Sequence, residues 1–227
     1  MRILEVCCGD LESAQAAARG GAQRVELCSA LSADGLTPSL GLIEAVRQIP
    51  DLRLHVLIRP REGDFVYTDA EFEIMRDDIL MAKQLGADGV VIGALTAEGD
   101  IDVERCKKLV EAAEGMQVTF HRAFDQCRHP QEALEQIIAM GCTRLLTSGQ
   151  ASSAQAGIPL LKQLVEQAGS RLILLPGAGV NHHNARTILD STGAQEIHGS
   201  LRSMQGNRPI TDSDIVRQTV LSIKEGL

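Results

Sequence analysis

Hydrophobic and polar positions alternate along this chain in a regular rhythm. Short runs of aliphatic or β-branched residues recur eight times, and each is followed by a longer stretch with the apolar spacing of an amphipathic helix. The predicted strands cover residues 2–7, 24–28, 54–59, 88–93, 117–121, 143–147, 171–176 and 195–199. The predicted helices cover residues 11–19, 40–49, 70–85, 102–114, 130–140, 156–168, 181–191 and 212–225.

Residues that start and stop helices stand at suitable places in this pattern. Asp69 and Asp102 suit an N-cap or a first turn, and Pro130 suits an early helical position whose backbone N–H is not needed. Six glycines follow predicted helix ends, where a left-handed C-cap is favoured: Gly20, Gly86, Gly115, Gly141, Gly169 and Gly193.

Alternating strands and helices predict an α/β fold with a parallel sheet, which is either open and doubly wound or closed into a barrel. Eight units within 227 residues favour closure. We therefore predict a single (β/α)8 TIM barrel, with residues 1–227 forming one domain.

Alternation within each predicted strand indicates which side chains point into the barrel. If the apolar face packs against the helices, as for Val25 and Leu27, several ionisable or thiol side chains point inward. Barrel interiors are normally filled by branched aliphatic residues, so these groups indicate a site at the C-terminal strand ends. The alternative is an internal salt-bridge cluster in which Arg59 balances Glu5 and Glu26. The predicted inward residues are Glu5, Cys7, Glu26, Cys28, His55, Leu57, Arg59, Thr119, His121, Glu196 and His198.

The stretch from Val118 to Asp125 forms one wall of the predicted site. His121, at the end of its strand, is a candidate general acid or base, and Asp125 is close enough along the chain to orient it or to act itself. Glu5 and Glu26 are further candidates for a catalytic base. Arg122 is expected to point away from His121 and to pair with an acidic helix residue. The alternative for His121 is a purely structural role.

Candidate anion ligands follow the ends of several strands. Arg59 and Arg61 offer guanidinium groups that suit a carboxylate or a phosphate. Small or polar residues after the last three strands could cradle an anion, as the corresponding loops of other barrels do: Ser148, Gly177, Gly179 and His198. The alternatives are simple turn geometry for the glycines and an internal ion pair for Arg59.

Two cysteines are candidates for a metal site. Cys7 and Cys28 project inward from neighbouring strands about 4.8 Å apart, so their sulfur atoms could meet. Soft thiolates select Cu(I), and Cys127 is a candidate third ligand. The remaining cysteines, Cys8, Cys106 and Cys142, are interpreted as small buried hydrophobic residues.

Composition narrows the possible partners. Aromatic residues make up only 2% of the chain, which indicates an aliphatic core and argues against stacking on nucleic-acid bases. The net charge is -8 and the basic residues are scattered, so neither a nucleic acid nor a membrane is an expected partner. No signal peptide or membrane span is recognisable, so we expect a cytoplasmic protein with free thiols.

Eight segments, in order within about residues 2 to 202, match a known pattern: Glu5-Val6-Cys7, Arg24 to Ala30, Gly35 to Ser39, Ile58 to Arg61, Gly63 to Phe65, Val118 to Asp125, Leu146 to Gly149 and Gly177 to Val180. Together these segments resemble the CutC family. The resemblance implies a (β/α)8 barrel, a cytoplasmic location and a role in copper homeostasis, with copper bound through cysteines that correspond to Cys7 and Cys28. The segment after Ser200 departs from the family pattern, because it is short and lacks the usual loop containing Arg-Asn.

The sequence thus supports a first hypothesis, a cytoplasmic copper-homeostasis protein that binds Cu(I) through Cys7 and Cys28. The alternative is a barrel enzyme that acts on a small anionic metabolite, with a phosphorylated one included. A third possibility is a binding scaffold without turnover. The expected partners are a copper ion or a small anionic ligand, and a homodimer is the default assembly.

Overall fold

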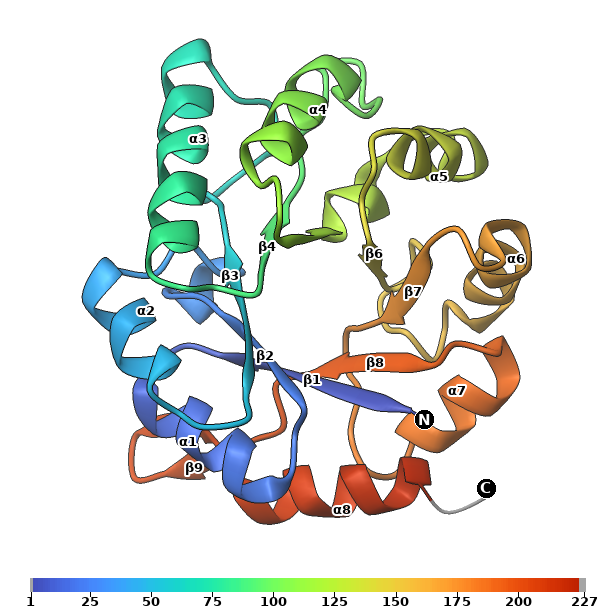
Figure 1. Cartoon of the computed structure of the whole chain (residues 1–227). Coiled ribbons are helices and arrows are strands. Elements are labelled where there is room, and N and C mark those ends of the chain that lie inside the picture. The colour runs from blue at the N-terminus through green and yellow to red at the C-terminus, as the bar shows by residue number, and fades with distance from the viewer. Residues whose placement is uncertain (1, 225–227) are drawn as a thin grey trace.

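The chain folds as a (β/α)8 barrel, as predicted (Figure 1). The computed structural model describes residues 2–224. Eight strands form one parallel sheet in the order β7-β6-β5-β4-β3-β2-β1-β8, and the edge strands β7 and β8 lie next to each other, so the sheet curls into a barrel inside a ring of helices. The strands are β1 (Ile3–Cys8), β2 (Arg24–Leu27), β3 (Arg53–Leu57), β4 (Gly89–Ile92), β5 (Gln117–Phe120), β6 (Arg144–Thr147), β7 (Ile173–Pro176) and β8 (Glu196–Gly199).

The eight predicted helices are all present, with shifted ends. The largest shift is at α7, which begins four residues later than predicted because Asn181 and Asn184 form a side-chain-bonded turn before it. Residue 225, the last of the predicted helix 212–225, lies outside the described residues. The helices are α1 (Leu11–Gly20), α2 (Leu40–Arg47), α3 (Asp69–Gln84), α4 (Val103–Ala112), α5 (Pro130–Ala139), α6 (Ile158–Ala168), α7 (Ala185–Thr192) and α8 (Ser213–Lys224).

The helix ends largely follow the predicted signals. Asp69 is the first residue of α3, Asp102 caps α4 and Pro130 opens α5. The prediction for Gly20 was wrong, because the left-handed cap of α1 is Gly21, with φ 89°. Gly20 is instead the last helical residue, at a point where a Cβ would lie 2.5 Å from the side chain of Val216 on α8. Glycine at this position therefore allows α1 and α8 to pack closely.

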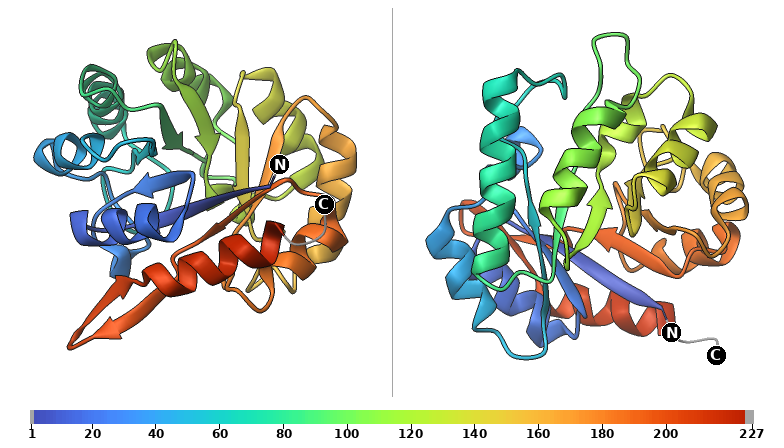
Figure 2. Two further views of the ribbon diagram at one scale, coloured as in Figure 1. Left: turned by 60° about the horizontal axis from the view of Figure 1, so that its bottom comes forward. Right: turned by 45° about the horizontal axis from the view of Figure 1, so that its top comes forward.

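Three short elements were not predicted. Two are 3₁₀ helices in the loops after β2 and β5, η1 (Leu31–Ala33) and η2 (Arg122–Gln126). The third is an antiparallel hairpin of β9 (Arg202–Gln205) and β10 (Arg208–Thr211), which projects from the barrel between β8 and α8 (Figure 2). The hairpin occupies the segment after Ser200 that departs from the family pattern.

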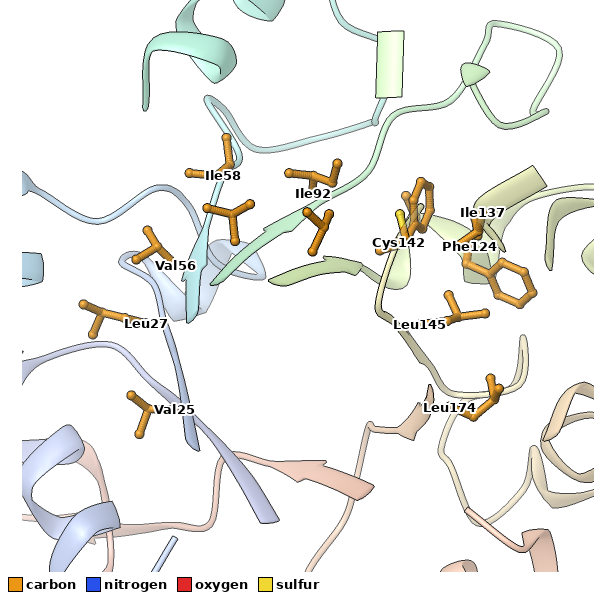
Figure 3. Packing of buried hydrophobic residues seen from close by; sticks show 14 of the residues in the cluster. Val25, Leu27, Val56, Ile58, Ile92, Phe124, Ile137, Cys142, Leu145 and Leu174 are labelled. Carbon is orange, nitrogen blue, oxygen red and sulfur yellow. The ribbon is translucent and has the colours of Figure 1, made fainter. Parts of the chain in front are cut away.

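The hydrophobic core lies between the sheet and the helices. Val25, Leu27, Val56 and Ile58 are fully buried and point away from the barrel axis, which confirms their predicted face (Figure 3). Because the helix-facing side of the sheet is packed in this way, the opposite face of each strand forms the barrel interior. No helix among residues 2–224 is long and apolar enough to cross a membrane.

Candidate functional site

Charged side chains fill the part of the barrel interior that lies nearer the N-terminal ends of the strands. Arg24 is fully buried and forms ion pairs with Glu5 and Glu196. Arg144 also binds Glu196, with its Nε 2.8 Å from Oε2. The cation that pairs with Glu5 is therefore Arg24, and the expected ion pair between Glu5 and Arg59 is absent. The strand register explains this outcome, because it aligns Glu5 directly with Arg24 on β2.

His198 links this charged network to the thiols. Its Nδ1 lies 2.8 Å from Oε1 of Glu5, and its Nε2 lies 3.7 Å from Oε2 of Glu26. Burial lowers the pKa of His198, but hydrogen bonds with Cys7 and Glu5 and the nearby carboxylate charges outweigh burial and raise it well above its usual value. The His198 side chain is therefore an imidazolium ion held between two carboxyl groups.

The two carboxyl groups beside His198 differ in character. Burial raises the pKa of Glu5, but the charge of Arg24 and the hydrogen bond with His198 outweigh burial and lower it well below its usual value. Burial also raises the pKa of Glu26, and there the raising effect prevails over the attraction of His198. Glu5 is thus a fixed anion, whereas Glu26 is the carboxyl group better suited to proton exchange.

The structure brings Cys7 and Cys28 together, with their Sγ atoms 3.6 Å apart. The hydrogen bond with Cys28, followed by burial, raises the pKa of the Cys7 thiol well above its usual value. One donor atom each from Cys7, Glu26 and His198 lies within 4.8 Å of the others, so this corner has the chemistry of a metal site. Cys127 does not join it, since its Sγ accepts a hydrogen bond from Gln150 instead.

A cavity of about 530 Å³ opens at the C-terminal ends of the strands, above the thiols. Eight of the predicted site residues line it: Cys7, Glu26, Cys28, Arg59, His121, Asp125, Gly179 and His198. Four others do not, namely Glu5, Arg61, Ser148 and Gly177. The cavity wall also includes side chains that sequence reasoning did not propose as ligands, among them Phe65, Leu146, Gln150 and Arg202.

His121 is buried in the cavity wall. Its Nδ1 accepts a hydrogen bond from the N–H of Ala123 at 3.1 Å, while its Nε2 has no partner among the described residues. Burial and, secondarily, the charge of Arg59 lower the pKa of His121 to about 3, so the ring is neutral. Gly93 makes room for this ring, because a Cβ there would lie 2.4 Å from its Cε1.

Asp125 forms no hydrogen bond with His121, contrary to the expected pairing. Its carboxylate accepts hydrogen bonds from Thr147, from Ser148 and Gln150, and from Nε of Arg122 at 2.8 Å. The backbone N–H and hydroxyl of Ser148 are therefore used by the protein itself and are not available to a phosphate. Arg122 does pair with an acidic residue of a helix, but that residue is Asp125 on η2, at the cavity.

The two predicted arginines have different surroundings. Arg59 is 4% exposed and donates to the backbone carbonyls of Ala33 and Gly35, at 2.8 and 3.0 Å, and of Gly63, at 2.8 Å. Arg61 forms ion pairs with Asp64 and Glu71 outside the cavity. Of the two, only Arg59 is placed to act on a ligand in the cavity.

Fold and site together define a (β/α)8 barrel whose C-terminal cavity carries a thiol pair and ionisable groups. The family model of the CutC family matches residues 2–203. The chain belongs to the CutC family, which is a copper-homeostasis family.

Similar proteins support this assignment. A CutC family protein of Bacteroides thetaiotaomicron is 55% identical over 199 residues, which cover 87% of this chain and 80% of that protein. A Homo sapiens protein named copper homeostasis protein cutC homolog is 50% identical over 201 residues, covering 88% and 74% of the two chains. The crystal structure of a CutC protein from Streptococcus agalactiae matches with a TM-score of 0.85 and 36% identity, over 88% of this chain and 99% of the other.

Proposed function

We propose that the protein binds Cu(I) between the sulfur atoms of Cys7 and Cys28 as part of copper homeostasis. The observation that carries this proposal is the 3.6 Å separation of the two Sγ atoms. Metal–thiolate bonds of about 2.3 Å, as in zinc sites, allow two sulfurs on one ion to be up to about 4.6 Å apart. Two thiolates are soft ligands of the kind that selects Cu(I).

The surroundings of the thiols suit a cation that arrives from the cavity. Cys7 and Cys28 both line the cavity, and the Glu26 carboxyl group is the next donor, whereas the imidazolium of His198 must lose a proton before it can bind a metal. A thiol binds a metal ion as a thiolate, so Cu(I) must displace protons from the thiols. Because the pKa of the Cys7 thiol is raised, the affinity for Cu(I) should increase with pH. The family membership and the copper-homeostasis name of the human relative give the same indication.

A titration under anaerobic, reducing conditions tests this proposal. Wild-type protein should compete with a chromogenic Cu(I) chelator for one ion per chain, and the Cys7→Ser/Cys28→Ser variant should lose this competition. Cys142→Ser is a matched control, since Cys142 is a free, buried cysteine outside the cavity. An unchanged Cu(I) affinity in the folded double variant would contradict the proposal.

The proposal includes a cytoplasmic location, residues 1–227 acting as one domain, and a homodimer. All six cysteines are free thiols, and Cys7 and Cys28 form no disulfide although their Sγ atoms are close. Free thiols suit a reducing compartment. Fractionation of cells followed by immunodetection tests the location, and sedimentation velocity tests the assembly.

As a second candidate we propose an enzyme that moves protons on a small anionic metabolite. The observation that favours it is the presence of a neutral imidazole and a carboxyl group of raised pKa, His121 and Glu26, on one cavity. Glu5 and Asp125 are less suitable, because each is held by donors of the protein itself. Wild-type protein should convert one or more compounds in a metabolite extract, as detected by mass spectrometry. The Glu26→Gln variant should leave these compounds unchanged.

A further inference from the structure

The cavity is much larger than one copper ion requires. Its volume of about 530 Å³ lies within the range of about 300 to 1,000 Å³ that is typical of small-molecule sites. The thiol pair occupies only part of its wall. Another part carries Arg59, Phe65 and His121, and Arg202 contributes an exposed side chain. These residues have no role in the proposed copper site.

Arg59 is a buried cation without a counter-ion. The other buried arginines, Arg24 and Arg144, each pair with a carboxylate. Arg59 instead donates to neutral backbone carbonyls and lies beside the Tyr67 hydroxyl, and no carboxylate among residues 2–224 lies within ion-pair distance of it. Its Nε–H has no hydrogen-bond partner in this part of the chain. Buried charges are normally paired, so the surroundings of Arg59 favour an anion that the protein does not supply.

His121 presents a second unused donor on the same wall. Since its Nδ1 accepts a hydrogen bond from a backbone N–H, the hydrogen of the neutral ring is on Nε2. That Nε2–H is buried and has no acceptor among the described residues, which is unfavourable unless a ligand or water accepts it. The ring of Phe65 contacts both groups, at 4.9 Å from the His121 ring centre and 5.0 Å from Cζ of Arg59.

We propose that the cavity binds a small organic anion whose charged oxygens accept hydrogen bonds from Nε of Arg59 and Nε2 of His121. Both nitrogens are shielded from solvent and the partly buried Phe65 ring packs beside both groups, so the proposal requires this ring to move aside when the ligand enters. Arg202 has no ion-pair partner in the described part of the chain and can bind a second charge. The proposed ligand is therefore a dianion, and this proposal depends on neither copper binding nor turnover.

The dianion can be a dicarboxylate or a phosphate monoester. Two N–H donors match the two oxygens of a carboxylate, and the donors of Ser148 and Gln150 that could have held a phosphate bind Asp125. The loop after β7 still lines the cavity with Ala178 at φ 83° and Gly179 at φ 69°, a turn where phosphate could approach. The structure favours the carboxylate, and both sources share the same charged-oxygen chemistry.

Calorimetric titration of metal-free, reduced protein with malonate and with glycerol 3-phosphate tests the proposal. At least one of the two should bind saturably, and Arg59→Gln should weaken that binding by about tenfold or more. Arg61→Gln is the matched control and should bind like wild type, because Arg61 lies outside the cavity. The Cys7→Ser/Cys28→Ser variant should also keep anion binding, which separates this site from the copper site.

A steric variant covers the case in which Arg59→Gln does not fold. Ala151→Phe adds a ring to the cavity wall and leaves Arg59 and His121 unchanged in sequence, and it should block the same probe. Absence of saturable binding of both probes to wild type at about 20 mM, well above a millimolar dissociation constant, would overturn the proposal. Unchanged binding in folded Arg59→Gln or Ala151→Phe would overturn it as well.

Discussion

The substitution Arg24→Met tests the charged network inside the barrel. Arg24 is fully buried and is an ion-pair partner of both Glu5 and Glu196. Methionine fills part of the arginine volume but carries no charge. Glu196 keeps Arg144, whereas Glu5 keeps only the imidazolium of His198 as a close cationic partner. The substitution therefore leaves a buried carboxylate with incomplete compensation.

Removing one partner of a buried ion pair costs about 3–5 kcal/mol in stability. With a urea m-value of about 2 kcal/mol per molar, this loss lowers the urea midpoint by about 2 M. Urea unfolding followed by circular dichroism at pH 7 measures it. Arg171→Met is a matched control, because the ion pair of Arg171 with Glu135 is about half exposed, and it should cost no more than about 1 kcal/mol.

The pH dependence gives a second readout of the same substitution. The pKa of Glu5 is lowered in the folded protein, so its stabilising contribution is present above its ordinary value of 4.5 and is lost as the pH falls below that value. From pH 5 to pH 3 the wild type should lose about 2 kcal/mol through this group. Without Arg24 the pKa of Glu5 rises, so the difference between wild type and variant should shrink over this range.

Two results would refute this reasoning. A loss below about 1 kcal/mol at pH 7 would show that Arg24 is not needed to compensate the buried carboxylates. The difference in unfolding free energy between wild type and Arg24→Met could also stay constant between pH 5 and pH 3. This result would show that Arg24 does not lower the pKa of Glu5. The double variant Arg24→Met/Glu5→Gln should recover part of the lost stability, because it removes the carboxylate that Arg24→Met leaves behind.

Three further substitutions test other parts of the interior. Burial lowers the folded-state pKa of His55 to about 4, so its contribution to stability is lost as the pH falls from about 6.5 to about 4. In urea unfolding His55→Gln should remove about 2 kcal/mol of the loss between pH 7 and pH 5 and keep the part that His121 causes, and an unchanged slope would contradict this. Asp125→Asn weakens several hydrogen bonds to the loop after β6, so it should speed amide hydrogen exchange in that loop and lower the free energy of unfolding by about 2 kcal/mol. Unchanged exchange would count against a role of Asp125 in holding the loop. Gly93→Ala should lower the free energy of unfolding in urea by about 1–3 kcal/mol, because the added Cβ clashes with His121. Gly41→Ala has open space at its Cβ and should be neutral or stabilising, so equal effects of the two substitutions would refute the packing argument.

The inward face of each strand could be predicted because alternation is a local property. Glu5, Cys7, Glu26 and Cys28 needed only the apolar pattern of their own strands. The partner of each group could not be predicted in the same way, since alternation does not give the height of a residue along the barrel axis. Arg59 follows the C-terminal end of β3 and lies at the cavity. Glu5 aligns with Arg24, the first residue of β2, and therefore lies nearer the N-terminal strand ends.

Some signals for the missed residues were present in the sequence. Arg24 stands two residues before Glu26 and therefore shares its inward face. The role of Asp125 had no such signal, because the chain after His121 turns into η2 and carries Asp125 to the loop after β6. That contact depends on two loops meeting, which no periodicity within one segment encodes. The hairpin of β9 and β10, by contrast, had a local signal that the prediction did not use, because Gly206-Asn207 is a two-residue turn typical of hairpins.

The cost of the charged network points to its purpose. Replacing a buried ion-pair cluster with hydrophobic residues is often neutral or stabilising, so stability alone does not explain why this barrel has one. The network does fix Glu5, and Glu5 binds Nδ1 of His198 at 2.8 Å. His198 in turn lies beside Cys7 and Glu26, at the edge of the cavity. The charges inside the barrel therefore act as a rigid support that positions the groups around the thiol pair, where aliphatic layers would leave those polar groups without partners.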